Sequence, residues 1–92
     1  MHQIILTKSY RRKAKKFLKV HPELKNKYKV TLQLLSKDPF IPSLRLHKLH
    51  GDLSSFYSIS LNYKYRIMIT LQIQDDQIIL VDIGSHEDIY RG

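Results

Sequence analysis

The segment 83–91, IGSHEDIYR, carries two side chains suited to proton transfer. His86 and Tyr90 lie four residues apart in it and follow an apolar run that is typical of a buried strand. Ser85 and Asp88 match the spacing of a capping box, so we expect His86 to open a short helix. The strand would therefore deliver an imidazole and a phenol to one edge of a sheet.

A second candidate segment, RLHKLHGDL, spans residues 45–53. His47, Lys48 and His50 lie within four residues of one another, and Gly51 permits a sharp turn after them. Clustered histidines also occur in zinc sites, but the chain has no cysteine and no H-E-x-x-H frame. We therefore expect cationic or proton-transfer chemistry here and no metal. We also expect no cofactor, because nucleotide-binding glycine motifs are lacking.

Arg66 is the third candidate, and it belongs to a stretch in which apolar and polar residues alternate. The alternation predicts that Ser58, Ser60, Arg66 and Met68 point to the same face, away from the core. A guanidinium beside small hydroxyl side chains leaves room for a ligand, and its planar fork suits a phosphate.

These residue types fit cleavage of RNA without a metal. The 2′-OH attacks the adjacent phosphate when a base removes its proton, an acid protonates the leaving 5′ oxygen, and cations stabilise the growing charge. Histidine suits both proton roles, and a tyrosine can stack on a base or donate a proton. The catalytic candidates are His86, Arg66, Tyr90 and His47. The candidates for binding RNA or phosphate are Lys48, His50, Lys64 and Arg45.

The elements that position these residues follow from hydrophobic periodicity. Residues 3–7 form a β-type run, and Ser9 is expected to cap a helix that extends to about Val20. Pro22 is suited to the first turn of a second helix that extends to about Lys37. The two helices would form a hairpin with an apolar stripe.

From Ser54 the period changes to two residues, which predicts three strands with turns near 62–64 and 74–77. The expected inward rows are Tyr57, Ile59 and Leu61; Tyr65, Ile67, Ile69, Leu71 and Ile73; and Ile79, Val81 and Ile83. We therefore predict one α+β domain over residues 1–92, with the order β-α-α-β-β-β(α). A small antiparallel sheet would pack against the N-terminal helix hairpin.

The charge distribution is uneven. Residues 1–48 hold thirteen Lys/Arg and two acidic residues (+11), whereas residues 49–92 hold three and six (−3), which gives the net charge of +8. Such a balance suits a polyanion or an acidic protein as partner, although a solvated cationic surface would look the same. No apolar run approaches a membrane span, and no signal peptide is evident, so we expect a cytoplasmic location.

The combination resembles the RelE/ParE superfamily of type II toxin–antitoxin toxins, and its YafQ branch most closely. The motifs are L-x-x-H-K-L-H-G-D-L, Y-R-I-M-I and I-G-S-H-E-D-I-Y-R, and the resemblance extends over the whole chain. It implies a RelE-like fold and a ribosome-dependent mRNA endonuclease. It also implies a cognate antitoxin that wraps the surface, with contact to DNA only through the antitoxin complex.

The resemblance also implies roles for individual residues. His86 matches the histidine of the G-[ST]-H motif, and Tyr90 matches the aromatic residue near the C-terminus. His47 matches the histidine before the L-x-G turn, and Arg66 resembles the phosphate-binding arginine of RelE.

Three positions depart from the family pattern. The paired lysines of RelE fall at Ser58 and Ser60, where Lys48, Lys64 or His50 would have to supply the charge. The YafQ histidine on that strand also falls near Ser60, and its acid near Lys64. Two alternatives therefore stay open: a ParE-like toxin that poisons DNA gyrase, and a catalytically weakened toxin that acts mainly as a binding module with its antitoxin.

Overall fold

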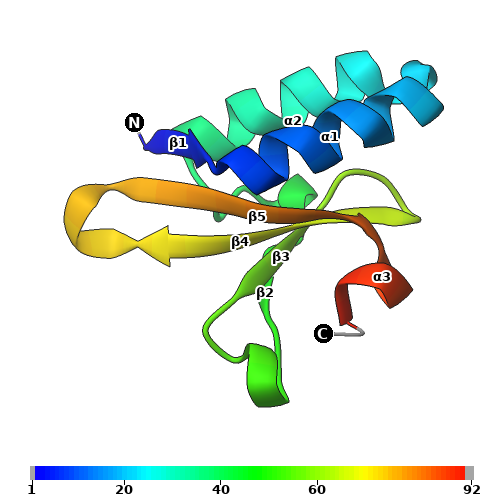
Figure 1. The fold of residues 1–92 in the computed structure, drawn as a ribbon. Coiled ribbons are helices and arrows are strands. Elements are labelled where there is room, and N and C mark those ends of the chain that lie inside the picture. Colours follow the sequence, from blue (N-terminus) through cyan, green and yellow to red (C-terminus); the bar gives the residue numbers. More distant parts are fainter. Residues whose placement is uncertain (1, 91–92) are drawn as a thin grey trace.

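The computed structural model describes residues 2–90, except for the side chains of Ile73 and Tyr90. Helices and strands follow one another as β1 (Gln3–Leu6), α1 (Lys8–Val20), α2 (Lys25–Lys37), β2 (His47–Lys48), β3 (Tyr57–Ser60), β4 (Tyr65–Gln72), β5 (Gln77–Ser85) and α3 (His86–Tyr90). Figure 1 shows α1 and α2 together on one side of the sheet and α3 on the other. The predicted α+β architecture is confirmed.

The strands form one five-stranded sheet in the order β1-β5-β4-β3-β2. β3, β4 and β5 form the predicted antiparallel meander. β1 adds a parallel edge strand, with Gln3 opposite Gln77 and Leu6 opposite Leu80. β2 was expected to be part of a connecting segment, but it pairs with β3 and places His47 opposite Ser58. The sheet is therefore wider than the meander and ends at the first histidine segment.

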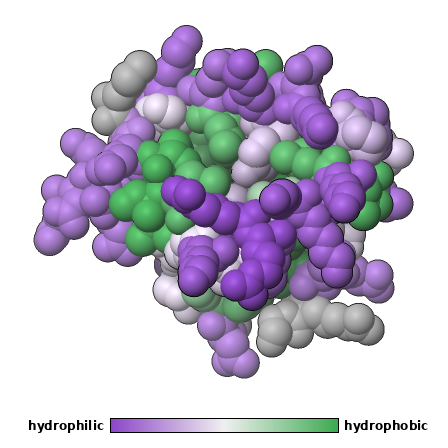
Figure 2. Space-filling view, turned by 45° about the horizontal axis from the view of Figure 1, so that its top comes forward, coloured by the Kyte–Doolittle hydropathy of each residue, from purple (hydrophilic) through white to green (hydrophobic). Residues whose placement is uncertain are grey.

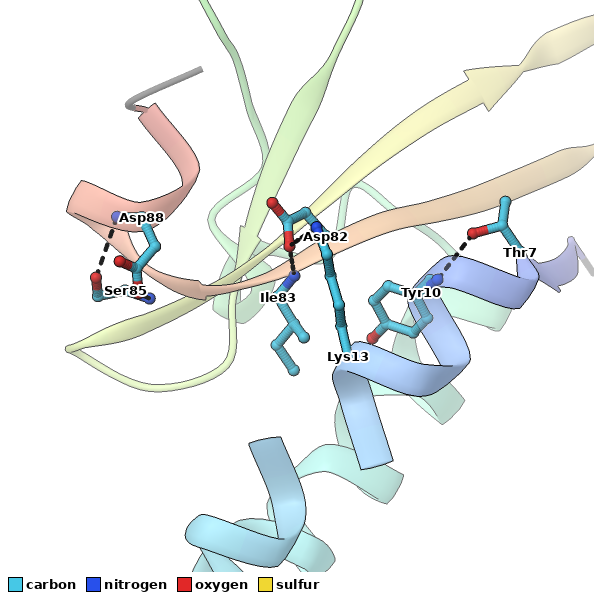
Figure 3. Close-up of polar contacts among 7 residues, drawn as sticks. All are labelled: Thr7, Tyr10, Lys13, Asp82, Ile83, Ser85 and Asp88. Carbon is cyan, nitrogen blue, oxygen red and sulfur yellow. Dashed lines mark hydrogen bonds and ion pairs between the residues drawn. The ribbon is translucent and has the colours of Figure 1, made fainter. Parts of the chain in front are cut away.

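The predicted cap of the first helix is wrong by two residues. Thr7 is the N-cap of α1: it has an extended backbone, and its side chain accepts a hydrogen bond of 3.1 Å from the backbone N–H of Tyr10 (Figure 3). Ser9 lies inside the helix. Both residues have the hydroxyl that a cap needs, so the choice depends on where β1 ends.

The second helix begins later than predicted. Pro22–Leu24 forms a separate 3₁₀ turn, and α2 starts at Lys25. The two helices are joined by a hydrogen bond of 2.8 Å between the hydroxyls of Tyr10 and Tyr28. Burial raises the pKa of both phenols. The helix hairpin therefore carries a polar pair inside its apolar interface.

The main core lies between the helices and the sheet. Its buried members are Tyr10, Ala14, Leu35, Leu44, Ile59, Leu61, Ile67, Ile69, Ile78, Leu80 and Ile83. The inward row of β5 was thus predicted correctly only at Ile83. Pairing shifts from Met68–Asp82 to Ile69–Leu80, which leaves Val81 as the extra residue of a β-bulge. β5 is apolar on both faces over this stretch, so its alternation could not indicate which face is inward.

A second, smaller cluster covers part of the opposite face. We call it the lower cluster: Leu49, Met68 and Ile89 are buried in it, and Leu53, Phe56 and Val81 pack around them. It joins the segment after β2, the centre of the sheet and α3. Within residues 2–90, no helix is both long and apolar enough to cross a membrane.

Candidate active site

His86 is held at the start of α3 by the predicted capping box. The backbone N–H of Ser85 donates to Oδ2 of Asp88, and the backbone N–H of Asp88 donates to Oγ of Ser85, both at 3.2 Å (Figure 3). Gly84 permits this approach, because a Cβ there would lie 3.1 Å from Cβ of Asp88. The side chain of His86 is exposed. The predicted presentation of this imidazole at a strand end is confirmed.

The lower cluster brings the two histidine segments together. Ile89 is 2% exposed and is buried in the same cluster as Leu49, which lies between Lys48 and His50. Because α3 is only five residues long, this apolar cluster and the capping box must supply most of its stability. The same cluster that holds α3 therefore also includes a residue of the loop after β2.

The result is an open hollow of about 380 Å³, which we call the histidine hollow. It is lined by His47, Lys48, Leu49, His50, Leu53 and His86. Three imidazoles and one ammonium thus converge from segments that are distant in the chain. Of the sequence-predicted site residues, four line this one hollow: His86, His47, Lys48 and His50.

Arg66 lies beside the histidine hollow and contacts its wall. Its Nε donates to Oγ of Ser58 at 3.0 Å, and its Nη2 donates to the carbonyl oxygen of Arg45 at 3.2 Å. Nη2 also lies 3.3 Å from Nδ1 of His47. A guanidinium can only donate, so this contact is a hydrogen bond when Nδ1 of His47 carries no proton. Arg66 therefore orients the imidazole as well as offering charge.

The serines in place of the family lysines are both engaged within the sheet. Ser58 is fully buried and accepts from Arg66. Ser60 donates to the backbone carbonyl of Asn62 at 2.8 Å. Neither side chain carries charge, so any cation at the site must come from other residues.

Arg45 and Lys64 flank the site in different ways. Arg45 has a left-handed backbone (φ 50°, ψ 48°), and the guanidinium of Arg66 holds its carbonyl group. Arg45 borders a separate hollow of about 250 Å³ against α2. Lys64 borders a hollow of about 390 Å³ that is also lined by Tyr63, Ser85, His86 and Glu87. We call this last one the turn hollow. His86 thus lies between the histidine hollow and the turn hollow.

Tyr90 ends α3, but its side chain lies outside the described part of the structure, so its predicted role stays a prediction. Tyr63 was not singled out from the sequence. An aromatic residue in a turn between two alternating strands was the available signal. Among the described side chains, no group of three His, Asp or Glu residues is arranged to hold a metal ion.

Solved structures with the same fold include several bacterial toxins. YafQ from E. coli strain BL21(DE3) superposes with a TM-score of 0.79 at 16% identity, covering 98% of this chain and 99% of that one. A metal-bound toxin from Helicobacter pylori has 28% identity and a TM-score of 0.74, covering 97% and 99%. A chain of the YoeB–YefM complex from Staphylococcus aureus has 18% identity and a TM-score of 0.72, covering 94% and 98%. None of the curated protein sequences matches significantly.

The family model described as the bacterial toxin of type II toxin–antitoxin system, YafQ, matches residues 2–91. The chain therefore belongs to the YafQ family of type II toxins, which confirms the resemblance inferred from its motifs. Membership in this family gives the chain an antitoxin protein as partner.

Proposed function

We propose that this toxin is a ribosome-dependent mRNA endoribonuclease that inhibits translation. The observation that carries the proposal is the histidine hollow, in which His86 from the end of β5 meets His47 from β2. Arg66 contacts one of these imidazoles and is permanently charged. Two proton-transfer groups next to a phosphate-binding cation are what metal-independent RNA cleavage requires.

The reaction proceeds within the RNA strand. One imidazole, at His86 or at His47, takes the proton of the 2′-OH, and the 2′ oxygen attacks the adjacent phosphorus. The bond from phosphorus to the 5′ oxygen breaks, and the other imidazole, in its protonated form, donates a proton to that oxygen. The products are a 2′,3′-cyclic phosphate and a free 5′-OH. Water can reach the open hollow, and no cofactor takes part.

Charge at the phosphate comes from Arg66 and Lys48. Of the five guanidinium N–H groups of an arginine, the Nε and Nη2 groups of Arg66 serve Ser58, Arg45 and His47. The two N–H groups on Nη1 are proposed to bind the phosphate oxygens. Lys48 lines the histidine hollow and adds a mobile point charge, and His50 lines it too. Tyr90 is proposed to contact a base.

The helix-bearing face suits ribosomal RNA. Seven cationic side chains of α1 are exposed: Lys8, Arg11, Arg12, Lys13, Lys15, Lys16 and Lys19. Figure 2, with the helices turned forward, shows hydrophilic side chains over most of this surface. Lys13 also reaches Asp82 on β5 at 3.3 Å. Such a surface favours binding to a polyanion. The proposal places the toxin in the cytoplasm, with contact to DNA only through the antitoxin complex.

The test is primer extension on mRNA translated in the presence of the purified toxin. We expect cuts with the wild-type protein. His86→Ala should reduce the cleavage rate by about 10²- to 10⁴-fold, the usual contribution of a general acid or base. His2→Ala is the matched control, because His2 borders neither the histidine hollow nor the turn hollow. Growth arrest with intact mRNA would contradict the proposal, and accompanying DNA breaks would point to gyrase.

A second candidate is a weakened toxin that acts mainly by binding its antitoxin. The observation that favours it is the state of Ser58, which is buried and bonded to Arg66 where a lysine would carry charge. Under this alternative, Ser58 and Ser60 leave the developing phosphate charge undercompensated. Expression without growth arrest, together with tight antitoxin binding, would support it.

A further inference from the structure

The turn between β3 and β4 presents an aromatic side chain on a fixed backbone. Tyr63 is 97% exposed, so its ring contributes nothing to the core. Oδ1 of Asn62 accepts hydrogen bonds from the backbone N–H groups of Lys64 and Tyr65, at 2.9 and 2.7 Å. Ser60 closes the other side by donating to the carbonyl of Asn62. An exposed ring on an ordered turn is prepared to bind a flat partner, because little backbone entropy is lost on binding.

Tyr63 lines the turn hollow, which extends to His86, and it also borders the separate hollow against α2. The other charged residues around this hollow are Lys64 and Glu87, whose charges oppose each other. Lys64 places its Nζ 5.4 Å from the centre of the Tyr65 ring, at the start of β4. A phosphate would gain from Lys64 but would be repelled by Glu87. A neutral ring with polar edges fits Lys64 and Glu87 better, since it can accept a hydrogen bond from the ammonium and donate one to the carboxylate.

We propose that the turn hollow is a subsite for one nucleobase of the RNA substrate, stacked on the ring of Tyr63. The subsite rests on the proposed function, because it binds the nucleotide next to the one whose phosphate is cut at His86. Stacking on aromatic side chains is the usual way in which proteins hold unpaired bases. Tyr63 then acts on the affinity for the substrate and takes no part in proton transfer.

A second exposed aromatic residue provides a comparison inside the same chain. Phe40 is 69% exposed and borders an apolar hollow of about 160 Å³ near His2 and Ile78. No catalytic candidate lines that hollow. Phe40→Ala therefore removes an exposed aromatic ring without touching the proposed subsite.

The experiment compares Tyr63→Ala, Tyr63→Phe and Phe40→Ala in cleavage of mRNA on ribosomes. Loss of one base–aromatic stack should lower kcat/KM for Tyr63→Ala by roughly 5- to 100-fold, mainly through KM. Tyr63→Phe keeps the stacking ring and should remain close to wild type, as should Phe40→Ala. Substrates with one abasic nucleotide near the cut should show a matching loss. When the abasic nucleotide is the one that stacks on Tyr63, Tyr63→Ala should lower kcat/KM no further, because the stack is already lost.

The outcomes separate the subsite from the nuclease. If wild-type toxin cuts mRNA and Tyr63→Ala behaves like Phe40→Ala, the subsite is overturned and the nuclease stands. If Tyr63→Ala only weakens neutralisation by the antitoxin, the ring belongs to a protein interface and the subsite is overturned again. If the wild-type protein cuts no mRNA while His86→Ala still arrests growth, both proposals fail.

Discussion

The two faces of the sheet are built for different purposes. On the helix side, eleven buried residues form one continuous core under α1 and α2. On the opposite side, only three of the described apolar side chains are buried, and they lie next to polar groups such as Ser58 and Arg66. The large core supplies most of the apolar burial and hence most of the stability. The small lower cluster sets the positions of the histidine segments, so damage there should affect activity more than folding.

The largest effects should come from truncating a buried side chain on either face of the sheet. Leu35→Ala on the helix side should lower the free energy of unfolding by about 2–5 kcal/mol, because Leu35 is fully buried. Ile89→Ala in the lower cluster should cost less, since the short α3 can loosen locally. Cleavage per folded molecule should nevertheless fall more for Ile89→Ala. Urea unfolding combined with the cleavage assay checks this.

The contrast between the faces fails if both variants lose activity only in proportion to their unfolded fraction. In that case α3 would hold His86 without help from Ile89, and the capping box of Ser85 and Asp88 would be enough.

An intermediate effect is expected from Arg66→Lys. An ammonium cannot reproduce the fork that joins Ser58, Arg45 and His47, so the imidazole of His47 loses its orientation. Cleavage should fall on the order of 10- to 100-fold, the cost of misplacing a reacting group by about 1 Å. Arg12→Lys on exposed α1 is the matched control. If Arg66→Lys and wild type cleave at the same rate, Arg66 contributes only its positive charge and does not orient His47.

The smallest effect concerns the helix side at alkaline pH. Burial raises the pKa of Tyr10 and Tyr28 in the folded protein. Above the ordinary tyrosine pKa of about 10, the unfolded chain releases these protons while the folded chain keeps them. The contribution of these two phenols to the free energy of unfolding is therefore fully present below about pH 10, and it decreases as the pH rises further. The decline should be shallower in Tyr10→Phe.

Urea unfolding of Tyr10→Phe and wild type on both sides of pH 10 measures this slope. At neutral pH the variant should lose only about 1 kcal/mol with the hydrogen bond to Tyr28. An equally steep alkaline decline in both proteins would show that other groups control it.

Local patterns in the sequence predicted the structure correctly. The alternation around Ile59 and Ile67 located the meander, and both residues are buried in the main core. The spacing of Ser85 and Asp88 predicted the capping box and the exposed position of His86. Prediction failed at β5, where a continuous apolar run concealed the bulge at Val81. It also missed β2, because two residues are too short to show a period.

For this protein, the sequence by itself determined the family, the strand and helix periods and the chemical groups available for cleavage. Only the tertiary structure decided that His86 and His47 line one hollow, and that Arg66 contacts His47. The physical reason is that hydrophobic periodicity depends on which residues are buried, and this pattern can be read from residues that are close together in the chain. The position of His86 relative to His47 depends on the lower cluster, in which Leu49, Met68 and Ile89 are buried together although they come from distant segments of the chain.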